Sequence, residues 1–157
     1  MHDTKTLKCA DCGFEYYFNP AAAVAALITD DVGRLLVTVR AQEPAKGTWD
    51  LPGGFADAGE SAEEALRREV KEELGIEIAS TKYLHSVPNV YEYKKVSYTT
   101  VDLVFLCTVE DGSEAKALDG VESLFFKAPA DIDPSRFGLS SMREIVSRYV
   151  SGLGQRA

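Results

Sequence analysis

The sequence has few cysteines and no long apolar segment, and each of these absences excludes a class of protein. Its three cysteines include only one close pair, Cys9 and Cys12, which is no disulfide framework and is typical of a reducing cytoplasm. No apolar run reaches the roughly 18 residues of a membrane span, and no basic-then-apolar leader is present. Basic clusters are also missing from a chain of net charge −8, which argues against a nucleic-acid partner.

The length of 157 residues suits one catalytic domain with a substantial core. Residues 1–20 are expected to form a short N-terminal arm that contains the cysteine pair and ends at Asn19-Pro20. Residues 21–157 are expected to form the domain itself.

Strand and helix patterns are distributed along the whole of this domain. A tight hairpin over Asp30–Gly33 is predicted between the first two strands, and Trp49–Gly54 is expected to be a short strand that runs into a turn. The C-terminal helix is expected to carry an apolar stripe that ends near Leu153, behind a capping box formed by Ser141 and Glu144. The predicted strands cover residues 21–29, 34–40, 96–109 and 121–127. Strands with two well-separated helices indicate an α/β layered sandwich.

The first helix carries the main chemical signal. It is expected to begin after Ser61, which forms a capping box with Glu64, and to stop before Gly75. Its buried stripe is predicted at four positions spaced by four residues, Ala62, Leu66, Val70 and Leu74. Six glutamates lie between positions 60 and 73.

Three of these glutamates converge on one face. Glu69, Glu72 and Glu73 are separated by three or four residues, and like charges at such spacings cost a helix about 0.2–0.5 kcal/mol per pair. Folding alone does not explain this repulsion. A hard divalent cation with oxygen ligands would relieve it.

The same segment resembles the signature of the Nudix hydrolases at every fixed position. The matching residues are Gly54, Glu60, Arg68, Glu69, Val70, Glu72, Glu73, Gly75 and Ile76. The resemblance implies an α/β/α sandwich around a mixed central sheet. It also implies a divalent metal, Mg²⁺ or alternatively Mn²⁺, held by Glu69, Glu72, Glu73 and the main-chain carbonyl of Gly53.

The resemblance assigns further residues to the reaction. Arg68 and Glu60 are expected to bridge the loop to the helix and to orient the metal glutamates. The base that activates water is expected to be Glu72 or Glu73, or else an acid of the later segment, Asp119 or Glu122.

Substrate recognition is expected to involve aromatic residues, since a nucleotide base can stack on them. Tyr91, Tyr93 and Tyr98 lie where members of the family place substrate-binding residues, although cross-strand packing is the alternative role for such tyrosines. Arg40 is a candidate for contact with phosphate, and Glu122 is a second polar candidate.

The cysteine pair resembles half of the zinc ribbon that precedes the domain in NADH pyrophosphatases. A structural zinc site needs four ligands, whereas Cys9 and Cys12 supply two and His2 is a remote third. No zinc is therefore expected, and the ribbon is either vestigial or completed across a homodimer. The proline-rich motif of NADH pyrophosphatases is not evident in Ser86–Thr100.

These observations predict a Mg²⁺-dependent pyrophosphohydrolase that cleaves a nucleoside diphosphate linked to another moiety, such as NADH or ADP-ribose. A nucleoside triphosphate pyrophosphohydrolase is the alternative, and a nucleotide sensor without turnover is a further one. Isomerisation of prenyl diphosphates would need a catalytic cysteine, but Cys107 is predicted to be buried and inert.

Overall fold

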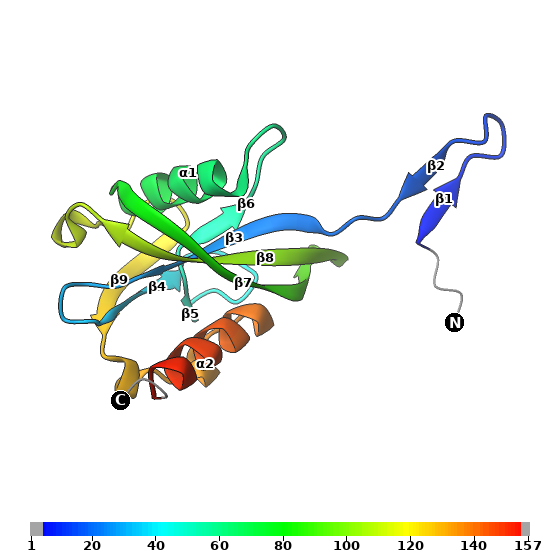
Figure 1. Ribbon diagram of the computed structural model, residues 1–157. Coiled ribbons are helices and arrows are strands. Elements are labelled where there is room, and N and C mark those ends of the chain that lie inside the picture. The colour runs from blue at the N-terminus through cyan, green and yellow to red at the C-terminus, as the bar shows by residue number, and fades with distance from the viewer. Residues whose placement is uncertain (1–4, 155–157) are drawn as a thin grey trace.

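The computed structural model describes residues 5–154, without the side chains of Tyr93, Ser113 and Leu153. Two β-sheets lie between two helices, with α1 and α2 on opposite sides (Figure 1). The strands are β1 (Thr6–Lys8), β2 (Glu15–Tyr17), β3 (Ala21–Ile28), β4 (Leu35–Arg40), β5 (Trp49–Asp50), β6 (Gly53–Phe55), β7 (Ile78–Tyr93), β8 (Val96–Val109) and β9 (Val121–Lys127), and the helices are α1 (Ala62–Leu74) and α2 (Ser140–Gly154). The predicted α/β sandwich with a mixed sheet is confirmed.

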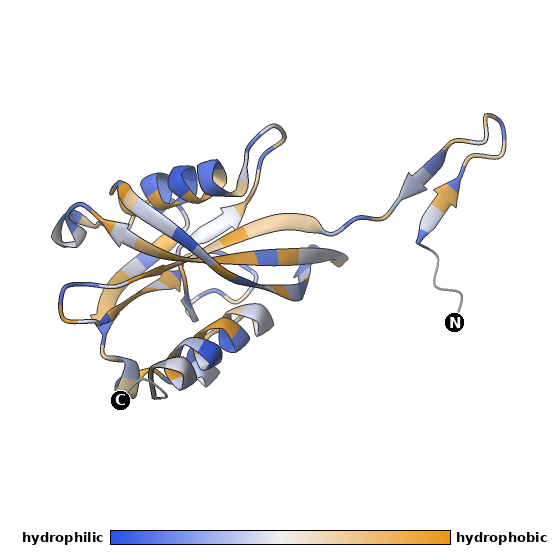
Figure 2. Cartoon of the chain, in the orientation of Figure 1, coloured by the Kyte–Doolittle hydropathy of each residue, from blue (hydrophilic) through white to orange (hydrophobic). Residues whose placement is uncertain are grey.

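Helix α1 begins and ends where its local sequence predicts. The Ser61 hydroxyl accepts the Glu64 N–H at 3.2 Å, and the Glu64 carboxylate accepts the Ser61 N–H at 2.8 Å. Gly75 ends the helix in the left-handed region at φ 73°, and its N–H donates to the Lys71 carbonyl. The buried side chains of the helix are Ala65, Leu66, Val70 and Leu74, and Ala62 is partly buried. Packing of this stripe on the sheet turns the charged face outward (Figure 2).

The larger sheet has the strand order β6-β3-β8-β7 and is mixed, because β3 and β8 run parallel while the other pairs are antiparallel. Strand β7, at one edge, was not predicted from the sequence. It contains Pro88, which edge strands tolerate because one side of the backbone forms no ladder. Its polar residues between positions 79 and 86 also hide the apolar alternation.

The turn predicted at Asp30–Gly33 forms, since the Gly33 N–H donates to the Asp30 carbonyl at 2.9 Å and the Asp30 N–H donates to the Arg34 carbonyl at 3.0 Å. The two strands that it joins do not continue as a paired hairpin. Strands β3 and β4 share a single bridge, Thr29 with Leu35, and then diverge into different sheets. Strand β4 instead pairs with β5 and β9 in the smaller sheet. The physical reason is that β4 is buried on both faces: Leu35 and Val37 enter the core beneath α2, whereas Leu36 enters the core beneath α1.

Helix α2 covers the second face with the expected stripe, in which Met142, Ile145 and Val146 are buried. The predicted position Leu153 lies outside the described side chains. The predicted capping box is wrong, because the Ser141 hydroxyl is buried without a hydrogen-bond partner and Glu144 pairs with Arg148 instead. The helix begins at Ser140, before the predicted cap residue Ser141.

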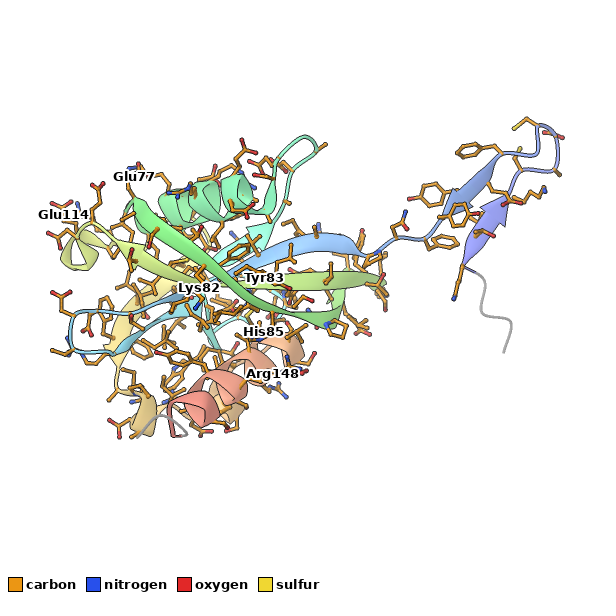
Figure 3. All side chains as sticks on the ribbon, viewed as in Figure 1. Glu77, Lys82, Tyr83, His85, Glu114 and Arg148 are labelled. Carbon is orange, nitrogen blue, oxygen red and sulfur yellow. The ribbon has the colours of Figure 1, made fainter. Side chains whose placement is uncertain are left out.

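Strand β7 faces this helix at His85, which lies near Arg148 (Figure 3). Burial lowers the pKa of His85, and the positive charge of Arg148 lowers it further.

The N-terminal arm is a two-stranded hairpin of β1 and β2 that extends away from the rest of the chain (Figure 1). The Cys9 N–H donates to the Phe14 carbonyl at 2.8 Å, and Cys9 and Cys12 are both exposed free thiols in the turn. The side chains of Phe14, Tyr16, Tyr17 and Phe18 are exposed. His2, the third zinc candidate, lies outside the described residues. Within residues 5–154, no helix has the length and apolar character needed to span a bilayer.

Candidate active site

A cavity of about 490 Å³ opens between α1, the larger sheet, strands β4 and β5, and the start of α2. Seven carboxylates line this cleft: Glu43, Asp50, Glu69, Glu72, Glu73, Asp102 and Asp119. Arg40 is the sole cationic side chain among the described lining residues. The cleft is therefore acidic, and its dimensions are those of a small-molecule site.

Glu73 is the most deeply placed carboxylate of the helix. Its Oε2 accepts the Gly53 N–H at 3.0 Å, which fixes the helix against the first residue of β6. Burial raises the pKa of Glu73 to about 8, and the negative charges of Asp50 and Glu69 act in the same direction. In the metal-free protein this carboxyl therefore holds a proton at neutral pH.

Glu69 lies against the backbone of β6. Burial raises the pKa of its carboxyl. A Cβ at Gly54 would lie 2.4 Å from Glu69 Oε1, and a Cβ at Gly53 would lie 2.0 Å from the carbonyl oxygen of Val24. Gly53 also has φ 148°, which side chains rarely permit. A side chain at Gly53 would therefore clash with the backbone of β3, and one at Gly54 would displace the Glu69 carboxylate from its place against β6.

Arg68 joins the loop before α1 to the helix. Its guanidinium donates to both carboxylate oxygens of Glu60, at 2.8 and 3.0 Å, and to the Phe55 carbonyl at 2.9 Å. It also donates to Glu69 at 2.9 Å and Glu72 at 3.0 Å. The hydrogen bonds from Arg68 lower the pKa of Glu60 to about 2. Arg68, which was predicted to bridge the loop and the helix, therefore contacts both.

Arg40 reaches the cleft from the end of β4. Its Nε donates to the Pro44 carbonyl at 2.8 Å, and its Nη1 forms an ion pair with the buried Asp50. Asp50 also accepts the Leu51 N–H at 2.9 Å. The guanidinium is thus held in place beside the cavity, where a phosphate oxygen could reach it.

The far end of the cleft is formed by neighbouring strands. Tyr91 and Tyr98 both line it, and the Tyr91 ring meets the Phe55 ring edge-on with centroids 5.6 Å apart. The side chain of Tyr93 lies outside the described part of the structure. Asn89 and Asp102 also line this end, although sequence reasoning missed them, and their only signal was that they are polar residues near or within predicted strands.

The structure separates the later candidate acids. Asp119 lines the cleft, whereas Glu122 is exposed on β9 and is not part of the lining. Neither the base nor the substrate-binding role predicted for Glu122 fits that position. Cys107 is buried, and burial raises the pKa of its thiol to about 12, so it is not available as a nucleophile.

The carboxylates of α1 have the chemistry of ligands for a metal ion. In residues 5–154, no three carboxylate, histidine or cysteine side chains stand close enough together to form a finished centre. Glu69 and Glu73 are nevertheless partly buried carboxylates, and burial and neighbouring negative charges raise the pKa of both, whereas Arg68 lowers that of Glu69. A hard divalent cation with oxygen ligands would offset the cost of burying these negative charges, so these residues fit it.

Comparison with known proteins gives a consistent result. The family model described as NUDIX domain matches residues 19–148. An ADP-ribose pyrophosphatase of Methanocaldococcus jannaschii is 34% identical over 115 residues, which cover 72% of this chain and 65% of that protein. An NAD-capped RNA hydrolase NudC of Pseudomonas entomophila is 27% identical over 151 residues, covering 96% of this chain and 52% of that protein.

A solved structure agrees with these sequence relatives. The crystal structure of a MutT NUDIX hydrolase from Burkholderia pseudomallei superposes with a TM-score of 0.70 at 30% identity, covering 82% of this chain and 97% of that chain. The chain thus spans only about half to two thirds of the length of the two curated relatives described above.

Proposed function

The chain belongs to the NUDIX domain family, and from this premise we propose that it is a Mg²⁺-dependent hydrolase of a nucleoside diphosphate linked to another moiety. ADP-ribose and NADH are the leading substrates. The pairing of partly buried carboxylates on α1, whose pKa values burial raises, with a cleft of about 490 Å³ that also contains aromatic rings carries this proposal.

The two ends of the cleft would have different roles in the reaction. Glu69, Glu72 and Glu73, with the Gly53 carbonyl, would hold the metal, which neutralises the diphosphate and favours attack by water. Arg40 would contact a phosphate oxygen from the opposite wall. The aromatic end would bind the nucleoside, and burial of the ligand would exclude water from the rest of the cleft.

A proton must leave the attacking water. Glu72, Glu73 and Asp119 all line the cleft and are the candidates for this base. Replacing each in turn by its amide, and comparing the pH dependence of kcat, would identify the base, because only its loss removes the acidic limb of the profile.

A substrate panel tests the proposed function. The panel contains ADP-ribose, NADH, nucleoside triphosphates and an NAD-capped oligoribonucleotide, each incubated with Mg²⁺ and scored by chromatography for the monophosphate products. ADP-ribose should give AMP and ribose 5-phosphate, at least tenfold faster than any triphosphate is hydrolysed. Preference for a triphosphate would favour the alternative pyrophosphohydrolase, and binding without hydrolysis of any member would favour a nucleotide sensor.

Two variants test whether the activity measured in the panel depends on this site. Glu69→Gln should reduce turnover by orders of magnitude without loss of the fold, since it removes a ligand charge and keeps the shape. Glu63→Gln, an exposed position on the same helix, should retain wild-type rates. Equal rates in wild type and Glu69→Gln would contradict the assignment. A cytoplasmic location is part of the proposal and is supported by three free cysteines.

A further inference from the structure

A polar row lies within the far end of the cleft, on one face of the β7–β8 pair. Asn89 is paired with Thr100, and the next rung on the same face pairs Val87 with Asp102. Asp102 is 3% exposed, Thr100 4% and Asn89 9%, yet all three line the cavity. Such buried polar groups in a strand are costly unless they are hydrogen-bonded, so their presence requires an explanation.

Their contacts within the protein are incomplete. Thr100 Oγ1 donates to Asp102 Oδ1 at 2.8 Å, and Ser140 donates to Asn89 Oδ1 at 3.0 Å. These bonds use one oxygen of the carboxylate and the oxygen of the amide. In residues 5–154, no side chain donates to Asp102 Oδ2 or accepts from Asn89 Nδ2. One acceptor and one donor therefore remain for a ligand.

The surroundings of this row suit a flat ring. Ala23, opposite Asp102 on β3, leaves space above the sheet. The Phe55 and Tyr91 rings line the same cavity, as do Leu139 and Met142 from the start of α2 and the residue before it. A cavity that combines apolar side chains with these polar groups favours a heteroaromatic ring that presents hydrogen-bonding atoms along its edge.

We propose that this end of the cleft is a subsite that selects the nucleobase by its edge, an inference that rests on the function proposed above. Asp102 Oδ2 accepts a hydrogen bond from an N–H₂ group of the ligand, and Asn89 Nδ2 donates to the adjacent acceptor. Adenine presents this arrangement at its amino group and neighbouring ring nitrogen. A purine with an oxo group in place of the amino group brings an acceptor against the carboxylate and is disfavoured.

The carboxamide of nicotinamide also presents an N–H₂ donor beside an acceptor. Either ring of a dinucleotide could therefore make these two hydrogen bonds. The purine arm of the experiment compares ADP-ribose with its hypoxanthine counterpart. The nicotinamide arm compares NADH with its 3-acetylpyridine counterpart, in which a methyl group replaces the amide nitrogen. The wild-type enzyme should prefer the amino-bearing compound about 10- to 100-fold in kcat/KM in one arm, as expected when a buried charged acceptor loses its donor.

The variant Asp102→Asn tests whether these polar residues hydrogen-bond to the ligand or only support the sheet. An amide can present either a donor or an acceptor, so the preference should fall to within about threefold, whereas a structural role would change the rates for both compounds equally. Glu110→Gln, an exposed carboxylate just beyond β8, is the matched control and should retain the wild-type preference. No preference in either arm of the wild type, or an unchanged preference in Asp102→Asn, would overturn the proposal.

Calorimetry separates this proposal from the proposed function. If the wild type hydrolyses no member of the panel, the function fails, but the subsite still predicts that AMP binds about tenfold more tightly than IMP, or nicotinamide mononucleotide more tightly than its acetylpyridine counterpart. Asp102→Asn should remove that difference. Equal affinities within both pairs for the wild type would refute the subsite. The melting temperature of each variant, measured in parallel, excludes unfolding as the cause.

Discussion

Replacing Glu73 by glutamine should stabilise the metal-free protein while it lowers turnover by orders of magnitude. The side chain of Glu73 is buried beside Asp50 and Glu69, and its carboxyl is forced to keep a proton until the pH nears 8. Glutamine has the same shape and can still accept the Gly53 N–H through its carbonyl oxygen. It carries no charge to be desolvated.

The size of the effect depends on pH. The folded protein binds this proton with a pKa of about 8, against an ordinary value of 4.5, so unfolding releases it. The unfolded state is therefore favoured increasingly as the pH rises from 4.5 to 8. With 1.36 kcal/mol per pKa unit, ionisation of Glu73 lowers the free energy of unfolding by about 1 kcal/mol at pH 5, about 3 at pH 7 and about 4 at pH 8.

Chemical denaturation of wild type and Glu73→Gln, both treated with chelator, measures this difference. The two free energies of unfolding should nearly coincide at pH 5, and at pH 8 that of the variant should be higher than that of the wild type. Addition of Mg²⁺ at pH 8 should then raise the stability of the wild type and not that of the variant, because binding to the folded state alone stabilises it.

A Glu73→Gln variant that is no more stable than wild type at pH 8 without metal would refute the reasoning. So would a gap that stays constant between pH 5 and pH 8. Glu63→Gln serves as the control, since its side chain is exposed on the same helix, and it should shift stability by less than about 0.5 kcal/mol at either pH.

Three further changes test the remaining structure. Gly54→Ala should lower turnover at least tenfold, because the new Cβ would stand 2.4 Å from Glu69 Oε1, whereas Gly152→Ala, with nothing within 4 Å in α2, should leave turnover unchanged and is the control. Arg68→Lys should lower the free energy of unfolding by about 1–2 kcal/mol in denaturation, because an ammonium cannot reproduce the two-pronged contact with the loop carboxylate. Cys9→Ser should retain activity, and elemental analysis of the wild type should find no stoichiometric zinc; tightly bound zinc would contradict this.

The element predicted best from the sequence is α1, since its limits depend on local interactions. Ser61 and Glu64 are three residues apart, and Gly75 directly follows the last turn. Such caps require no knowledge of the rest of the fold. The shorter strand β9 was also predicted within its observed bounds, Val121–Lys127.

Strand pairing was harder to predict because it depends on distant residues. The turn at Asp30–Gly33 favours a hairpin locally, yet Leu35 and Leu36 must be buried on opposite faces, and pairing with β9 achieves this. Edge strand β7 showed no clear period in the sequence, and its identity follows from its partner β8. The local preference of a turn for a hairpin is overridden where burial of both faces of a strand requires a different pairing.

The candidate site shows the same difference between local signals and those that depend on distant residues. The carboxylates of α1 were found because they lie on one helical turn. The position of Glu122 outside the cleft, and of Asp102 inside it, depends on the register of β9 and β8. The one available signal for Asp102 was a charge within an apolar strand, Val101–Phe105, and such a charge is informative only when the face it occupies is known.

The contacts of Arg68 bear on how the proposed site would lose and regain a metal ion. The Arg68 guanidinium donates to Glu69 and Glu72, while Glu60 and the Phe55 carbonyl hold it in place independently. Loss of a metal ion would therefore leave these two carboxylates beside a cation instead of repelling each other. An arriving ion would compete with a guanidinium that stays attached to the loop, so the ion could be exchanged between reaction cycles without rearrangement of the helix turn.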